Sequence, residues 1–374
     1  MTSTEPAHVT ASGVRRARGL GLGFPGETGP WNAITDVQGI EVGTVTLISG
    51  EGKLEVGQGP IRTGVTAILP RGKSGLHAGC AAGSYSLNGN GEMTGLAWIE
   101  EAGLLDTPIA ITNTNSCGVA RDAIAQWLVT KRRTTQQDWG LPVAAETFDG
   151  DLNDIDGFHV TKDHVFEALN NASSGALELG NVGGGTGMIT YDFKGGNGTA
   201  SRKVRIGDDD FTLGVFVQSN FGRREDLVIL GVPVGHHFND AKLRGKDQGS
   251  IIAIVATDAP LLPHQLKRLA RRVPLGLART GTIASNSSGD IFLAFSTANI
   301  VAYSGGKDRH TLDCLSDHAL DPLFRAVVES VEEAVVDAMI CGETMTGRDG
   351  NVSISLPQDR LLALLAGKGR LAPT

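Results

Sequence analysis

The sequence is poor in cysteine, aromatic residues and positive charge. Its 374 residues include 4 cysteines and 5% aromatic residues, and the formal net charge is −8. The cysteines lie far apart with no CxxC spacing, so neither a disulfide framework nor a zinc site is indicated. The negative net charge leaves no basic field for nucleic acid, and we expect no metal or organic cofactor.

An apolar signal segment is also missing. Residues 1–18 are polar and contain arginines, without the apolar core of a signal peptide. We therefore expect a flexible tail over 1–18, a cytoplasmic protein and no membrane segment. The remaining residues, 19–374, can bury a large core and are expected to form a single domain.

Glycine is abundant, at 51 residues without a repeat, which predicts many tight turns and close backbone approaches. Residues 21–26 match GxGxxG, but no strand precedes them and Pro25 and Pro30 would break a following helix. Residues 183–187 lack the ending of a phosphate-binding loop and are interpreted as close backbone packing. The pair His236-His237 has no ligand partners nearby, so we predict no metal site there.

Helical and strand patterns alternate without a domain break. Ser116 and Thr161 are expected to cap helices through about Leu128 and over the apolar positions 165–169. Apolar residues at helical spacing predict further helices over 262–273 and 323–338. Continuous apolar runs predict strands buried on both faces, over 213–217, 227–232, 251–256 and 291–295.

Gly249 and Ser250 lie between a charged loop, 242–249, and the apolar strand that follows. If the chain cuts itself at this bond, Ser250 carries both a nucleophilic hydroxyl and the amine that activates it. An α-amino group titrates at about 7.7–8.0, so this amine can act as a base near neutral pH. Glycine tolerates the distorted backbone that such a cut requires.

Several other segments form a series with this one. The series consists of residues 88–95 (NGNGEMTG), 111–118 (ITNTNSCG), 146–150 (ETFDG) with 152–154 (LND), 180–187 (GNVGGGTG), 217–222 (VQSNFG), 249–252 (GSII) with 256–261 (ATDAPL), and 287–296 (SSGDIFLAFS). In this order the segments resemble the L-aminopeptidase/D-esterase family, the DmpA-type self-processing aminopeptidases that include β-peptidyl aminopeptidases. The resemblance extends from about residue 19 to about residue 342. It implies an α+β fold, a four-layer αββα sandwich like that of N-terminal-nucleophile hydrolases.

The resemblance also implies catalytic roles around Ser250. Asn220 matches the asparagine whose amide stabilises the oxyanion of the tetrahedral intermediate, although an asparagine there also suits a turn. Ser288 and Asp290 match residues that contact the amine of the nucleophile. Some relatives have glutamate at the position of Asp290.

Two further residues are expected to bind substrate. Glu146 matches the glutamate that pairs with the free ammonium group of the substrate, which makes such an enzyme an aminopeptidase. Phe148 departs from the family, since several relatives have a tyrosine there. Phenylalanine keeps an apolar wall and removes a hydroxyl from the site.

The sequence therefore predicts a serine aminopeptidase, amidase or esterase that acts on short peptides, amino-acid amides or esters. Cleavage would give chains 1–249 and 250–374, which stay associated, and the resemblance implies a homotetramer of such pairs. One alternative is a nylon-type ω-amino-acid oligomer hydrolase, and the other is an ornithine-type acyltransferase of similar layout. The relatives of both kinds use threonine as nucleophile, so Ser250 argues against them. No GxSxG motif of an α/β-hydrolase occurs.

Overall fold

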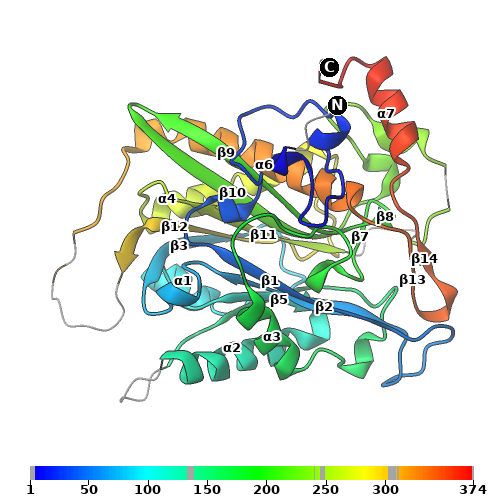
Figure 1. Cartoon of the computed structure of the whole chain (residues 1–374), viewed down its shortest axis with the longest axis horizontal. Helices are drawn as coiled ribbons and strands as arrows, with labels where there is room; N and C mark the ends of the chain where they lie inside the picture. Colours follow the sequence, from blue (N-terminus) through cyan, green and yellow to red (C-terminus); the bar gives the residue numbers. More distant parts are fainter. Residues whose placement is uncertain are drawn as a thin grey trace.

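The structure, a computed structural model, describes residues 5–132, 139–239, 241–244, 249–301, 309 and 311–372. Two β-sheets lie face to face, and helices cover the outer face of each (Figure 1). The first sheet has the strand order β1-β2-β5-β6, and the second has the order β4-β3-β12-β11-β10-β9. This arrangement confirms the expected α+β class and the four-layer αββα sandwich.

The strands of the first sheet are β1 (Glu41–Ser49), β2 (Ile61–Leu69), β5 (Ile109–Asn113) and β6 (Val143–Thr147). Those of the second are β3 (Gly79–Ser86), β4 (Leu104–Leu105), β9 (Gly196–Ile206), β10 (Asp209–Asn220), β11 (Ser250–Thr257) and β12 (Ile291–Val301). Two short ribbons pair β7 (Ile189–Thr190) with β8 (Phe193–Lys194) and β13 (Met345–Thr346) with β14 (Val352–Ser353).

Helices α2 (Cys117–Arg132) and α3 (Lys162–Asn171) cover the first sheet. Helices α4 (Pro263–Ala270) and α6 (Asp321–Ile340) cover the second, and α5 (Val273–Arg279) packs on α6. Helix α1 (Leu96–Ala102) contacts β3, and α7 (Gln358–Gly367) lies near the C-terminus. Within the described residues, no helix is both long and apolar enough to cross a membrane.

The central strands are buried on both faces. In β11, Ile252 and Ile254 belong to the core between the two sheets, whereas Ile251 and Val255 belong to the core beneath the helices. Successive side chains of a strand point to opposite faces, so an unbroken apolar run is what a strand between two apolar layers requires. The glycine-rich turn at 183–187 is closely packed as well, because a Cβ on Gly184 would lie 2.0 Å from Oε1 of Gln218.

The helix starts partly follow the sequence expectations. Thr161 is the N-cap of α3, as predicted, in a capping box with His164. The side chain of Asn113, however, caps the turn that leads into α2, accepting the N–H of Ser116 at 3.0 Å. The helix expected over 262–273 is also interrupted, because α4 ends before Pro274, whose ring and missing N–H do not fit a helix interior.

The prediction of a strand over 227–232 is wrong. Ile229 and Val232 exchange two backbone hydrogen bonds, at 3.0 and 2.9 Å, across a two-residue turn. Leu230 and Gly231 have φ angles of 50° and 77°, which are typical of such a hairpin turn. The segment is apolar because Leu227 and Ile229 pack in the core beneath the helices, and not because it joins a sheet.

The structure differs from the flexible tail expected over 1–18, because residues 16–18 are held against α6 by hydrogen bonds to Asp337 and Glu333. Arg16 is only 2% exposed, and its Nη2 lies 2.6 Å from a carboxylate oxygen of Asp337. The same guanidinium also donates to the backbone carbonyls of Trp31, Asn32 and Thr199. Composition alone suggested a solvated tail because it does not show that α6 carries buried carboxylates.

We expect Arg16→Ala to lower the free energy of unfolding by about 3–5 kcal/mol, because it leaves the carboxylate of Asp337 buried without its cation. Arg15→Ala is the matched control, since Arg15 is exposed, and it should change this quantity by no more than about 0.5 kcal/mol. Denaturant unfolding of the two variants is the measurement. An equal loss in both would show that the ion pair does not stabilise the fold.

Candidate active site

The predicted catalytic residues meet at one end of the second sheet. Antiparallel pairing places Asn220, the last residue of β10, opposite Ser250, the first residue of β11. The parallel pairing of Ile252 with Ile291 then brings the start of β12 to the same end. The turn just before β12 contains Ser288 and Asp290, so four of the predicted residues converge from three segments.

Ser250 is enclosed by the turn at 288–290. Ser250 is only 6% exposed, and its Oγ accepts a hydrogen bond from the backbone N–H of Gly289 at 3.0 Å. Oδ1 of Asp290 accepts the backbone N–H of Ile251 at 3.2 Å and the hydroxyl of Ser288 at 2.6 Å. The buried carboxylate therefore lies beside the first peptide unit of β11, where it can interact with an amine on Ser250.

Asn88 completes the surroundings of this carboxylate and was not singled out from the sequence. Its Nδ2 donates to Oδ2 of Asp290 at 3.1 Å, and its Oδ1 accepts the backbone N–H of Asp290 at 2.6 Å. Asn88 follows β3, which pairs with β12 so that Ser86 lies opposite Ile291. The motif at 88–95 was visible in the sequence, but only this register shows that its first residue faces Asp290.

Gly249 approaches the backbone of β10 too closely for any side chain. A Cβ at this position would lie 1.4 Å from the carbonyl oxygen of Asn220. Backbone distortion during a cut already favours glycine here, and the close packing adds a steric reason. The residue before the proposed cut must therefore be glycine for the bond to lie in this place.

The amide group of Asn220 is fully buried and fixed in orientation. Its Nδ2 donates to the backbone carbonyl of Phe148 at 2.8 Å. Its Oδ1 accepts the N–H of Ile189 at 2.8 Å and a guanidinium N–H of Arg244 at 3.1 Å. The oxygen thus faces two donors, and the NH2 group, with a second hydrogen to donate, faces the side of Phe148.

Glu146 lies at the end of β6 in the first sheet and is 3% exposed. Its Oε1 accepts the backbone N–H of Glu92 at 2.9 Å, and its Oε2 accepts the hydroxyl of Thr114. Burial raises the pKa of Glu146, while these two hydrogen bonds oppose that rise. Thr114 is a second contact that the sequence analysis missed, although it belongs to the motif at 111–118.

A contact between two glycines joins Glu146 to the surroundings of Ser250. A Cβ on Gly91 would lie 3.3 Å from Oε1 of Glu146 and 3.1 Å from Cα of Gly289. Gly289 in turn donates its N–H to Ser250. A chain of close contacts through Gly91 and Gly289 therefore connects the carboxylate of Glu146 to the hydroxyl of Ser250.

Phe148 follows β6 and is 37% exposed, so its ring can form part of a wall at the site.

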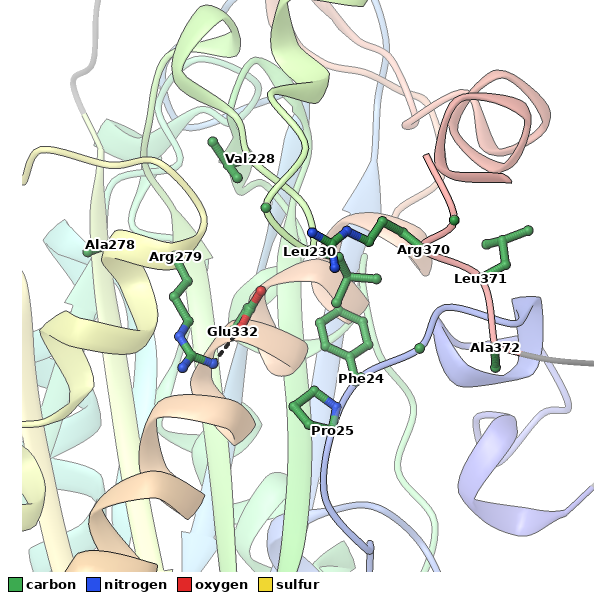
Figure 2. Close-up of a pocket in the computed structure, with 13 residues that line it drawn as sticks. Phe24, Pro25, Val228, Leu230, Ala278, Arg279, Glu332, Arg370, Leu371 and Ala372 are labelled. Carbon is green, nitrogen blue, oxygen red and sulfur yellow. Dashed lines mark hydrogen bonds and ion pairs between the residues drawn. The ribbon is translucent and has the colours of Figure 1, made fainter. Parts of the chain in front are cut away.

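A hollow elsewhere in the molecule, of about 760 Å³, is lined by residues such as Phe24, Leu230 and Arg370. Figure 2 shows Arg279 and Glu332 as an ion pair in that hollow, and its lining includes no predicted site residue. Among the described residues, no group of three or more histidines, cysteines or carboxylates could hold a metal ion.

Comparison with known proteins identifies the family of the chain. The model of "Peptidase family S58" matches residues 32–353. A β-peptidyl aminopeptidase, BapA of Sphingosinicella microcystinivorans, is 48% identical over 96% of this chain and 93% of its own length.

Two solved structures are similar throughout. The L-aminopeptidase D-Ala-esterase/amidase of Ochrobactrum anthropi, described as a prototype of the serine aminopeptidases and a variant of the Ntn hydrolase fold, superposes with a TM-score of 0.91 at 50% identity, covering 96% of this chain and 99% of that one. A β-aminopeptidase of Burkholderia sp. gives a TM-score of 0.87 at 45% identity, with coverage of 95% and 99%. In sequence and in fold, this chain belongs to peptidase family S58.

Proposed function

We propose that this S58 peptidase cuts itself between Gly249 and Ser250 and then acts as a serine aminopeptidase on short peptides, amino-acid amides or esters. The observation that carries the proposal is the position of Ser250, at the start of a buried strand, with its Oγ and the following N–H both bonded to the turn at 288–290. The family match and the names of the relatives support aminopeptidase activity.

In the self-cleavage step, Oγ of Ser250 attacks the carbonyl carbon of Gly249. The peptide C–N bond breaks, the nitrogen of Ser250 takes up a proton, and an ester joins the two residues. Water then hydrolyses this ester, leaving a carboxylate on Gly249 and a free amine and hydroxyl on Ser250. The crowding of Gly249 against the backbone of Asn220 supports this step, since it holds the residue before the scissile bond against the end of β10.

In the catalytic step, the amine of Ser250 accepts the proton of its own hydroxyl as Oγ attacks the substrate carbonyl. An N–H of Asn220 stabilises the negative oxygen of the tetrahedral intermediate. The proton passes to the leaving amine or alcohol, and water releases the amino acid from the acyl-enzyme. Ser288 and Asp290 are proposed to hold the amine of Ser250, a role that the bond between Asp290 and the N–H of Ile251 supports.

Glu146 is proposed to bind the ammonium group of the substrate. Its carboxylate is buried and accepts two hydrogen bonds, so a substrate amine would add a charge-assisted bond of about 1.5–3 kcal/mol. A blocked amine could not form this bond and would leave the carboxylate without its counter-ion. Phe148, in place of a tyrosine, is proposed to make the pocket wall more apolar.

The family match favours this function over the two alternatives, the nylon-type oligomer hydrolase and the ornithine-type acyltransferase. Incubation with an N-acetylated amino acid and an acceptor amine separates them. Transfer of the acetyl group without peptide hydrolysis would favour the acyltransferase.

We further propose that the two chains stay associated in a homotetramer of such pairs, and that the protein is cytoplasmic. The first proposal rests on the family resemblance and is tested by light scattering. The second is supported by the free thiols of Cys80, Cys117 and Cys341, which are buried and unpaired with one another, as suits a reducing compartment.

Purified protein is expected to consist of fragments 1–249 and 250–374 by intact mass under denaturing conditions, and Ser250→Ala to remain one chain. Gly249→Ala should cut at least about tenfold more slowly, because the added Cβ moves the scissile carbonyl away from its place. Gly367→Ala is the control, since a Cβ there meets nothing within 4 Å. Wild-type protein that hydrolyses amino-acid amides while its chain stays intact would contradict the mechanism.

Alanine amide should be hydrolysed and N-acetylalanine amide should not, because only the first has an ammonium group for Glu146. Glu146→Gln should lower kcat/KM by about tenfold to a hundredfold, the equivalent of a bond of about 1.5–3 kcal/mol. Glu101→Gln makes the same change at an exposed position of α1 and should have no effect. Equal rates on the free and the blocked substrate would exclude this role of Glu146.

The acidic side of the pH profile of kcat/KM should contain two ionisations, that of the Ser250 amine, which must be unprotonated to act as a base, and that of Glu146. Burial and the nearby charge of Glu92 raise its pKa, so activity should fall with decreasing pH at a higher pH than for an ordinary glutamate. Thr114→Val removes a hydrogen bond that lowers the pKa of this carboxyl group and should therefore move the ionisation of Glu146 to higher pH. Thr114→Ser keeps the hydroxyl and should leave the ionisation of Glu146 at the pH of the wild-type protein. If Thr114→Val does not move the fall of kcat/KM at low pH, that fall belongs to another group.

A further inference from the structure

Arg244 is a buried cation in the segment that leads to the proposed cut. The residue is 6% exposed, and its Nε lies 2.5 Å from Oδ2 of Asp151. Its Nη1 donates to the carbonyl of Ile189 at 3.3 Å, and its Nη2 donates to Oδ1 of Asn220 at 3.1 Å. The backbone N–H of Arg244 is also bound, by Oδ1 of Asp192 at 2.9 Å.

These contacts decide which way the amide of Asn220 points. With Oδ1 facing the guanidinium and the N–H of Ile189, both donors are satisfied. A flipped amide would place its NH2 group against two donors and would separate Nδ2 from its acceptor, the carbonyl of Phe148. A donor that is oriented before the reaction stabilises an oxyanion without reorganisation during the reaction.

The guanidinium also acts on the amide electronically. A cation bonded to the amide oxygen withdraws electron density from the nitrogen, and hydrogen bonds in a chain strengthen one another in this way. Asp151 balances the charge of Arg244 through Nε, whereas Nη2 of the same guanidinium donates to Asn220, and the carboxylate of Asp151 is 22% exposed. The ion pair is therefore neutral as a whole, while one N–H of its guanidinium contacts the amide oxygen of Asn220.

We propose that Arg244 is a positioning residue of the oxyanion hole, which orients and polarises the amide of Asn220; this inference rests on the proposed function. Arg244 makes its contribution through Asn220 and does not touch the substrate. The guanidinium fork can bond a carboxylate, a carbonyl and an amide oxygen at once, which the single ammonium group of a lysine cannot do in the same geometry.

The arrangement does not depend on the intact peptide bond at Gly249. The partners of Arg244 described above are Asp151, Ile189, Asp192 and Asn220, which all belong to the chain 1–249. Cleavage would therefore leave these contacts in place, so Arg244 can serve the mature enzyme as well as the uncut chain.

The test compares Arg244→Met, Arg244→Lys and Lys242→Met, using alanine amide and protein shown by mass to be fully cut. Arg244→Met should lower kcat by about tenfold to a hundredfold and change KM by less than about threefold, because the lost interaction acts in the transition state. Arg244→Lys should recover part of the loss. Lys242→Met is the control from the same segment, since Lys242 is exposed and pairs only with Glu225 among the contacts described.

A double-mutant cycle separates positioning from simple loop stabilisation. Asn220→Ala alone should lower kcat by about 10²–10³. In that background, Arg244→Met should cost less than about threefold more, because the amide on which Arg244 acts is gone. The same fold-loss in both backgrounds, or an unchanged kcat with only a lower melting temperature, would overturn the proposal.

Two further results keep the test decisive. If Arg244→Met fails to cut itself, the cycle is run with Arg244→Lys and with Asp151→Asn, which loosens the guanidinium without changing Asn220. If either variant lowers kcat by the same factor in the wild-type and in the Asn220→Ala background, the inference is equally overturned. Wild-type protein that neither cuts itself nor hydrolyses alanine amide would instead overturn the proposed function, which distinguishes the two failures.

Discussion

The antiparallel pairing of β10 with β11, which sets Asn220 opposite Ser250, determines most of the site. It places the proposed oxyanion donor and the proposed nucleophile at the end of the same ladder. It also brings the carbonyl of Asn220 against Gly249, where no side chain fits. A shift of one residue would turn every side chain of β11 to the opposite layer, so the two apolar cores on its faces hold the register that the site needs.

The charged groups of the site are each satisfied in a different way, and this difference suits different tasks. Glu146 accepts one backbone and one hydroxyl hydrogen bond and has no counter-ion among the residues that the structure describes, which suits the binding of a cation. Asp290 is surrounded by Ser288, Asn88 and the backbone of Ile251, a setting that holds it in one position. Arg244 is already paired with Asp151, so its remaining donors orient neutral groups. Of the two buried carboxylates, Asp290 has more hydrogen-bond donors around it than Glu146, which suits a supporting role for Asp290 and a binding role for Glu146.

The layers of the fold could be predicted from the sequence because their signals are local. Strands buried on both faces have unbroken apolar runs, and Thr161 lies where a helix begins. The errors also have local causes: a leucine with positive φ at Leu230 gives no sign of its turn, and the apolar spacing over 262–273 continues past Ala270, where α4 ends.

The site itself could be predicted only in part. The candidates Ser250, Asn220, Ser288, Asp290 and Glu146 came from motifs that resemble a family, and the structure brings them close together. Asn88, Thr114 and Arg244 were missed because their partners are far away in the sequence, and only the strand register and the packing of the loops bring them into contact.

The ion pair between Arg16 and Asp337 joins the beginning of the chain to its last long helix, across the proposed cut. Strands β3 and β10 likewise flank β11 and β12, so the two products of a cut would share one sheet interior. Such partners have no exposed docking surfaces through which they could meet as separate molecules, and each would have to fold around the other. The nucleophile would thus be released only after the sheet had assembled, so only correctly folded chains would become active.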